Sequence, residues 1–415
     1  SSTPQRDYYP LPQPGLAPTG ITKDEAGDLW ILAARPYRTY LPIVTHWWND
    51  YTPAYGVQFY SRLDESDGFD TIADAGTQWV RTPLSWASVE PSDRTPDNYN
   101  WTSVDTKVSN ATQRDVNLVL TISGNPSWAA VYAQGPVTDT ADIVEFVGAL
   151  VERYDGDGID DAPESLTVKH FELYNEPDNG NVIHAEHGCY GYWGQNGTEY
   201  ANLLQTLYPV VKAANANTKL VFGGLALDNF EPNGPFDPQF LDDVLSACQG
   251  KNCFDVMNFH YYPCFRSNWS AYGIDIIGKA NYVRQKLTTY GFNDIPMMCT
   301  ETGYPSGVVW GDDERQSRYV VKVNVRGLAA SLPVIIWYKV DDQGDAGLPG
   351  LLDDDLQPKP SYWAFQTITP MLENAIYQRQ LTSADTGSNE IEGYMFKVYN
   401  QRLDVVWTEG DSWFS

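Results

Sequence analysis

Basic side chains and long apolar runs are both scarce in this chain of 415 residues. Lysine and arginine number 27 against 54 aspartates and glutamates, which gives a formal net charge of −27. Such an acidic surface repels nucleic acid and anionic membranes, so we expect neither as a partner. No apolar run approaches the roughly 18 residues that cross a bilayer, so the sequence predicts no transmembrane segment.

Cysteine is also sparse, and its five copies cannot all pair with one another. Cys248 and Cys253 flank a short hydrophilic loop and could close a small disulfide. Cys189 and Cys264 each follow a candidate strand, and they could meet where the carboxyl ends of these two strands lie. Spacing alone leaves the connectivity open. Cys299 lies within an apolar run and is expected to be a buried thiol.

The first residues of the chain, Ser1–Gln5, lack the charged and apolar regions of a signal peptide. An export signal, if one is made, has therefore been removed from this sequence. Together with the possible disulfides, this leads us to expect a secreted, extracellular protein.

From residue 55 onward, short apolar runs alternate with amphipathic stretches. Apolar residues between 143 and 151 recur at i, i+3, i+4, i+7 and i+8, which predicts one face of a helix, and the spacing recurs between 203 and 211. Eight strands separated by helices predict an α/β fold of the (β/α)8 TIM-barrel type. A doubly wound sheet is the alternative, but no Gly-x-Gly-x-x-Gly follows the first strand. The eight expected strands are 56–60, 79–83, 118–122, 168–174, 220–224, 256–260, 296–300 and 334–338.

The two ends of the chain differ from this pattern. Residues 1–50 are rich in proline and aromatics and are expected to form an N-terminal extension over the barrel, which we place at 51–375. After a helix around 362–372, residues 376–415 alternate as strands do and predict a small or incomplete C-terminal β-module. Within it, a two-residue hairpin link, Asn400-Gln401, is expected to join its two strands.

Two glutamates carry the candidate chemistry. Glu176, within the block Phe171–Asp178, and Glu301 each end an apolar strand and are followed at once by turn residues. The carboxyl ends of barrel strands meet at the catalytic face, and a pair of carboxylates there is the apparatus for breaking a glycosidic bond. Asn175 could hold a sugar hydroxyl beside the reacting carbon. Glu172 shares a strand face with Glu176 but is expected to lie deeper in the barrel.

With these residues the chain resembles the clan A glycoside hydrolases, most of all their family 39 and family 5 branches, over about residues 55–375. The block around Glu176, Glu301, the run His260-Tyr261-Tyr262 and Trp337 carry the resemblance. It implies a retaining hydrolase of β-linked glycans, with Glu176 as acid/base and Glu301 as nucleophile. Where many family 5 members place a histidine after strand three, this chain has Ser123-Gly124-Asn125, which favours the family 39 branch.

The resemblance also implies roles for residues around the carboxylates. Arg81 is expected to lie under the nucleophile, and Tyr262 is expected to donate a hydrogen bond to the same carboxylate. Trp337 is expected to form the floor of the sugar site. Trp128 and Trp193 follow a strand end or lie in the long loop after strand four, so their rings are candidates for stacking on a sugar. His260, at a strand end, could position a hydroxyl or relay a hydrogen bond.

Two patterns suggest metals, although the chemistry needs none and we expect no metal or cofactor. The run His184-x-x-His187-x-Cys189 offers zinc ligands, but no fourth ligand is identifiable nearby. Residues 155–161 have the acidic composition of a calcium loop without full EF-hand spacing.

Two other functions remain open at this point. A non-catalytic carbohydrate-binding barrel would need one carboxylate missing or misplaced, and a transglycosylase would use the same residues. In each case an oligo- or polysaccharide is the expected partner, and the sequence does not fix the oligomeric state.

Overall fold

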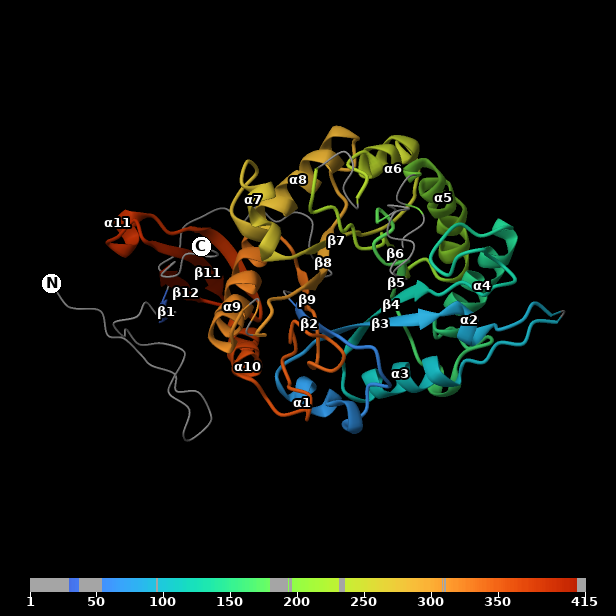
Figure 1. Ribbon diagram of the computed structural model, residues 1–415, viewed down its shortest axis with the longest axis horizontal. Coiled ribbons are helices and arrows are strands. Elements are labelled where there is room, and N and C mark those ends of the chain that lie inside the picture. Colours follow the sequence, from blue (N-terminus) through green and yellow to red (C-terminus); the bar gives the residue numbers. More distant parts are fainter. Residues whose placement is uncertain are drawn as a thin grey trace.

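The computed structural model describes residues 30–36, 54–94, 96–179, 193, 196–230, 236–307, 309 and 311–408. Eight parallel strands form a nearly closed barrel with helices around it (Figure 1). The sheet runs in the order β6-β5-β4-β3-β2-β9-β8-β7. Bridges from Val221 to Val256 and from Leu225 to Phe259 bring β6 and β7 together. The expected TIM-barrel fold is therefore confirmed. Its strands are β2 (Ala54–Gln58), β3 (Trp79–Ser85), β4 (Asn117–Ser123), β5 (His170–Leu173), β6 (Lys219–Val221), β7 (Met257–Tyr261), β8 (Met297–Thr302) and β9 (Val334–Trp337).

The helices pack their apolar faces on the outer surface of the strands. In α4 (Thr140–Arg153) the side chain of Asp139 accepts the Ala141 N–H at the helix start, and the apolar residues predicted from 143 to 151 are buried. The other helices are α1 (Phe69–Asp74), α2 (Trp86–Val89), α3 (Thr102–Gln113), α5 (Gly197–Ala214), α6 (Phe240–Cys248), α7 (Arg266–Trp269), α8 (Asp275–Thr289), α9 (Asp313–Ala329), α10 (Pro360–Leu372) and α11 (Ser383–Thr386).

Side chains that point into the barrel form two layers. Because strand residues alternate between faces, every second residue points inward. The lower layer is an apolar cluster that includes Trp79, Val119, Val221, Met298 and Ile336. One step closer to the carboxyl ends, the inward side chains are polar and buried, and they support the candidate site. They include Arg81, Thr121, Glu172, Asn258 and Thr300.

Strand β8 carries one extra residue near its end. Its register with β7 and with β9 shifts between Cys299 and Thr302. As a result two successive side chains face the interior: Thr300 bonds to Asn258, and Glu301 bonds to Arg81. Such bulges re-aim side chains next to active sites, and here the bulge turns Glu301 inward.

A second, four-stranded antiparallel sheet lies beside α9 and α10, at the left of Figure 1. It contains β1 (Trp30–Pro36), β12 (Gln401–Thr408), β11 (Ile391–Val398) and β10 (Ala375–Gln380) in that order. Strand β1 comes from the segment expected to be only an extension, so the sheet draws on both ends of the chain. The domain boundaries at 50 and 375 stay predictions.

The hairpin of this sheet differs by one residue from the prediction. Val398 pairs with Gln401, so Tyr399 and Asn400 form the link instead of Asn400 and Gln401. Tyr399 has a positive φ of 51°, as a tight hairpin turn requires. A tyrosine is unusual in that position, which is why the sequence pattern misplaced the turn.

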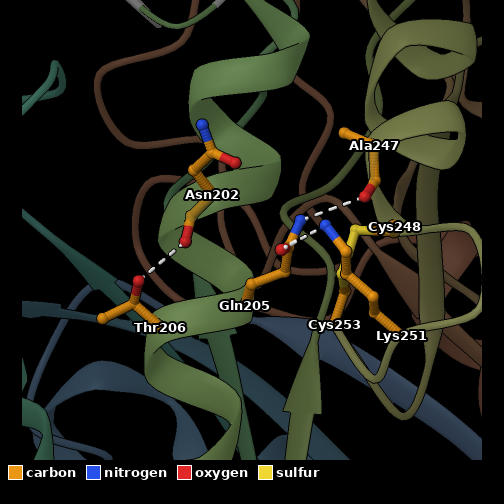
Figure 2. Close-up of a disulfide and its surroundings, with 7 residues drawn as sticks. All are labelled: Asn202, Gln205, Thr206, Ala247, Cys248, Lys251 and Cys253. Carbon is orange, nitrogen blue, oxygen red and sulfur yellow. Dashed lines mark hydrogen bonds between the residues drawn. A yellow bond between two sulfur atoms is a disulfide. The ribbon is translucent and has the colours of Figure 1, made fainter.

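One predicted disulfide is present. Cys248 and Cys253 are bonded at the end of α6, and Figure 2 shows the loop that they close. Gln205 of α5 holds this loop: its amide donates to the Ala247 carbonyl at 3.2 Å and accepts from Lys251 Nζ at 2.9 Å.

Of the remaining cysteines, Cys299 is a buried free thiol as predicted, and Cys264 is an exposed free thiol. Cys189, with which Cys264 could have paired, lies outside the described residues, as do His184 and His187 of the zinc pattern. Among the helices that the structure describes, none is both long and apolar enough to cross a membrane.

Candidate active site

Glu176 stands in a sharp turn directly after β5. Tyr174 and Glu176 both have positive φ, 61° and 46°, a conformation that costs non-glycine residues roughly 1–3 kcal/mol. Asp178 holds the turn, because its buried carboxylate accepts the N–H groups of Ala226 at 2.9 Å and Leu227 at 2.7 Å from the loop after β6. Backbone strain at a strand end is typical of functional sites, and here it places the Glu176 side chain at the barrel mouth.

Glu301 lies across the mouth on β8 and is held by two donors. Tyr262 donates its hydroxyl to Glu301 Oε1 at 2.6 Å, and Arg81 donates Nη1 to Glu301 Oε2 at 3.2 Å. Both contacts are those that the resemblance implied. Donors to a carboxylate favour its charged form, so this environment suits an ionised nucleophile.

The two glutamates and His260 converge. One carboxylate oxygen of Glu176, one of Glu301 and a ring nitrogen of His260 all lie within 4.8 Å of one another. His260 Nδ1 is 2.9 Å from Glu176 Oε1 and 3.7 Å from Glu301 Oε2. Side-chain exposure is 24% for Glu176 and 11% for Glu301, so a ligand at the mouth can reach both.

Burial sets the protonation of this group. It raises the pKa of Glu176, although the positive charges of Arg81 and Lys279 work in the other direction. Burial also lowers the pKa of His260 to about 4, so the imidazole is neutral at neutral pH. A carboxyl with a raised pKa beside a neutral histidine is the arrangement that favours a general acid.

Glu172 lies beneath this pair and is fully buried. Its carboxylate accepts Arg81 Nε at 2.6 Å and Arg81 Nη2 at 3.0 Å. It also accepts Thr121 Oγ1 at 2.7 Å, the Gly224 N–H at 2.9 Å and Asn258 Nδ2 at 2.8 Å. The expectation that Glu172 lies deeper than Glu176 is therefore confirmed.

Gly224 also leaves space for the ring of His260. A Cβ at this position would lie 1.9 Å from Nε2 of His260, so only glycine leaves room for the imidazole. The pair Gly223-Gly224 was visible in the sequence, but it was assigned to a strand, whereas β6 ends at Val221.

The structure corrects the placement of Trp337. Its ring is 2% exposed and packs on Tyr319 of α9 at 6.3 Å, and its N–H donates to the Pro349 carbonyl at 2.9 Å. Inward positions on β9 belong to Val334 and Ile336, so alternation turns Trp337 toward the helices.

Two tyrosines that the sequence did not indicate, Tyr60 and Tyr338, lie at the mouth instead. Tyr338 follows β9, and its ring is 6.3 Å from that of Tyr60 and 6.5 Å from that of Tyr262. Burial raises the pKa of Tyr338, and the charge of Glu301 contributes to the same shift. Counting every second residue along β9 from Val334 would have found it.

The remaining candidates are placed as follows. Asn175 Oδ1 accepts Arg81 Nη2 at 2.6 Å, directly beside Glu176. Trp128 is half-buried, and its N–H donates to the Glu90 carbonyl at 3.2 Å. Trp193 is 2% exposed and packs on core tyrosines, which favours a structural role over sugar stacking.

The acidic loop after α4 brings Asp155, Asp157 and Asp161 within 4.8 Å of one another. These carboxylates accept backbone N–H groups of their own loop, at Gly156, Asp157, Gly158 and Ile159. That is the geometry of a self-capped turn, and calcium binding there stays a prediction.

A barrel that presents two carboxylates of unlike environment at its carboxyl face defines the class of carbohydrate-cleaving barrel enzymes. The family model described as cellulase, glycosyl hydrolase family 5, matches residues 42–339, so the chain belongs to this family of clan A glycoside hydrolases. The match falls on family 5, whereas the residues after strand three had favoured family 39. Carbohydrate is thus its substrate class. No curated protein matches the chain.

Solved structures from both branches share the fold. A family 39 glycoside hydrolase from Bacteroides cellulosilyticus WH2 has 21% identity and a TM-score of 0.64, over 86% of this chain and 71% of that one. A monomeric β-xylosidase from Caulobacter crescentus CB15 has 15% identity and a TM-score of 0.57, over 84% and 72%. A family 5 subfamily 18 enzyme from Streptomyces cattleya, in complex with GlcNAc, has 14% identity and a TM-score of 0.56, over 78% and 80%.

Proposed function

We propose that the protein hydrolyses β-glycosidic bonds of an oligo- or polysaccharide with retention of configuration. The observation that carries this proposal is that one carboxylate oxygen of Glu176 and one of Glu301 lie within 4.8 Å of each other. Retaining enzymes hold their carboxyl groups about 5–5.5 Å apart, whereas inverting enzymes need about 6.5–9.5 Å to fit a water between carboxylate and sugar.

In the first step Glu176, as the carboxylic acid, donates its proton to the glycosidic oxygen. Glu301 attacks the anomeric carbon, the bond to the leaving group breaks, and a glycosyl ester forms on Glu301. Arg81 and Tyr262 orient Glu301 through the hydrogen bonds that they donate to its two oxygens.

In the second step Glu176, now a carboxylate, takes a proton from water. The resulting hydroxide oxygen bonds to the anomeric carbon, and Glu301 leaves as a carboxylate. Two inversions give net retention. The neutral His260, 2.9 Å from Glu176, supports this alternation because its ring can donate to the carboxylate or accept from the acid.

The test is Glu301→Ala, assayed on aryl β-glycosides and on β-glucan, xylan and mannan. Turnover should fall by at least roughly 10⁴-fold, because no glycosyl ester can form. Added azide, which fits the space left by the side chain, should restore cleavage and give the inverted glycosyl azide. Near wild-type turnover in Glu301→Ala would refute the assignment.

We also propose that the protein acts outside the cell. The Cys248–Cys253 disulfide supports this, because such bonds persist in oxidising compartments. Fractionation of the native host should find the protein in the medium or on the cell surface, and confinement to the cytosol would contradict the proposal.

A further inference from the structure

The buried carboxylate of Glu172 is bonded to residues from several barrel strands, below the two catalytic glutamates. Its carboxylate accepts hydrogen bonds from Arg81 on β3, Thr121 on β4, Gly224 after β6 and Asn258 on β7. Asn258 in turn bonds to Thr300 on β8 at 2.7 Å. The anion is thus the shared acceptor of a polar layer directly below the catalytic pair.

The orientation of Arg81 depends on this acceptor. Two of its three nitrogens donate to Glu172 in a bidentate pair, which fixes the guanidinium plane. The same plane then presents Nη1 to Glu301 and Nη2 to Asn175. Nη1 also donates to Gln58 at 3.0 Å. Rotation of the guanidinium would therefore disturb both catalytic strand ends at once.

The charge of Glu172 matters as well as its shape. Arg81 is the cation that touches the site, and Glu172 and Glu301 both compensate its charge. Arg81 lowers and Glu172 raises the pKa of Glu176. Among the described residues, the charged and titratable groups around Glu176 are Arg81, Glu172, Asp178, Asp228, His260, Tyr262, Lys279, Glu301 and Tyr338.

We propose that Glu172 is a positioning residue for the reaction inferred above, on which this inference rests. It orients Arg81 toward Glu301 and Asn175, and its charge prevents the arginine from drawing the proton off Glu176. Glu172 itself is fully buried beneath the mouth and does not touch the substrate.

Glu172→Gln tests the role of the negative charge, because it keeps the length of the side chain. Glu172→Asp tests the role of that length, because it keeps the charge. In Glu172→Gln the charge of Arg81 is compensated by Glu301 alone and should favour the ionised form of Glu176. The basic limb of the kcat/KM profile should then move to lower pH, by on the order of one unit, and the rate on unactivated substrates should fall about 10-fold. In Glu172→Asp the charge stays, so the basic limb of the kcat/KM profile should not move. The shorter side chain cannot accept from both Arg81 nitrogens, so kcat should fall.

Asp275→Asn is the matched control. Asp275 is also a buried carboxylate that pairs with an arginine, Arg326, but it lies on α8 outside the barrel interior. This variant should lose thermal stability and keep the wild-type pH profile. A folded Glu172→Gln variant whose basic limb and whose rate on unactivated substrates match the wild type would overturn the inference. A Glu172→Asp variant with wild-type kcat would overturn it as well.

A second readout does not depend on turnover. With ¹³C-labelled glutamate, the carboxyl resonance that disappears in Glu176→Gln can be titrated in the wild type and in Glu172→Gln. A titration displaced to lower pH supports the role of Glu172, and an unchanged one overturns it. If the wild type proves inactive on every glycan, the proposed function fails while this titration still decides the inference.

Discussion

Glu176 and Glu301 are the same amino acid in two different surroundings, and that difference supports the roles that we propose for them. Glu301 accepts a phenolic hydroxyl and a guanidinium, so its negative charge is stabilised. Glu176 contacts a neutral imidazole, and burial raises its pKa. Pairs of titratable groups whose environments separate their proton affinities are the mark of acid and nucleophile pairs.

At this scale we predict the behaviour of Glu176→Gln. Substrates with poor leaving groups should lose roughly 10²–10⁴-fold in rate, because they need the proton. Dinitrophenyl glycosides should still form the glycosyl ester and then stall, which gives a burst in stopped-flow kinetics. The wild type should lose kcat/KM as pH rises through the raised pKa of Glu176, and this basic limb should be absent in the variant.

Equal losses on both kinds of substrate would show that Glu176 has another task. Glu390→Gln offers a control, because Glu390 is an exposed glutamate directly before β11, and its rates should match the wild type on both substrates.

Single residues at strand ends were predictable where a motif marked them. Glu176, Glu301, Arg81 and Tyr262 lie together as the resemblance implied. The cause of the raised pKa of Glu176 was not predictable, because burial is its largest contribution. Burial depends on the whole surrounding layer, which no local pattern reports.

At the scale of elements, one residue of register decides which aromatic ring meets the ligand. Trp337 and Tyr338 are neighbours on and after β9 but face opposite sides of the barrel wall. The resemblance to clan A enzymes had implied Trp337 at the sugar site, and an indole would offer a large stacking surface there. The bulge in β8 is equally invisible in the sequence, because Thr300-Glu301 reads as ordinary strand alternation.

This register gives a paired prediction. Tyr338→Ala should raise KM roughly 10-fold and leave stability nearly unchanged, because it removes a half-buried ring at the mouth. Trp337→Ala should instead lower the free energy of unfolding by about 3–5 kcal/mol, because it empties space between β9 and α9. Steady-state kinetics and chemical denaturation measure the two effects, and the reverse pattern would refute the register.

At the scale of the whole molecule, the small sheet is joined to the barrel by a buried arginine. Arg326 of α9 donates to both carboxylate oxygens of Glu392 on β11, at 2.8 and 2.6 Å, and also pairs with Asp275 of α8. Its guanidinium lies 5.3 Å from the ring centre of Trp407 on β12. The sequence predicted the sheet from its alternation but not this junction, because its partners are far apart in the chain.

We predict that Arg326→Met destabilises barrel and sheet together. Two buried carboxylates would lose their cation, which costs about 3–5 kcal/mol. Calorimetry should show one transition at a lower Tm. Arg379→Gln is the control, because the pair of Arg379 on β10 with Asp385 on α11 is partly exposed and should matter little. An unchanged Tm in Arg326→Met would contradict this account of the junction.

The stereochemistry of the product tests the central claim most directly. ¹H NMR recorded in the first minutes of hydrolysis, before mutarotation, distinguishes the anomer that the enzyme releases. If Glu176 and Glu301, whose nearest oxygens lie within 4.8 Å, act by double displacement, a β-glycoside should release the β-anomer first. Initial release of the α-anomer would show direct attack by water and would contradict the account.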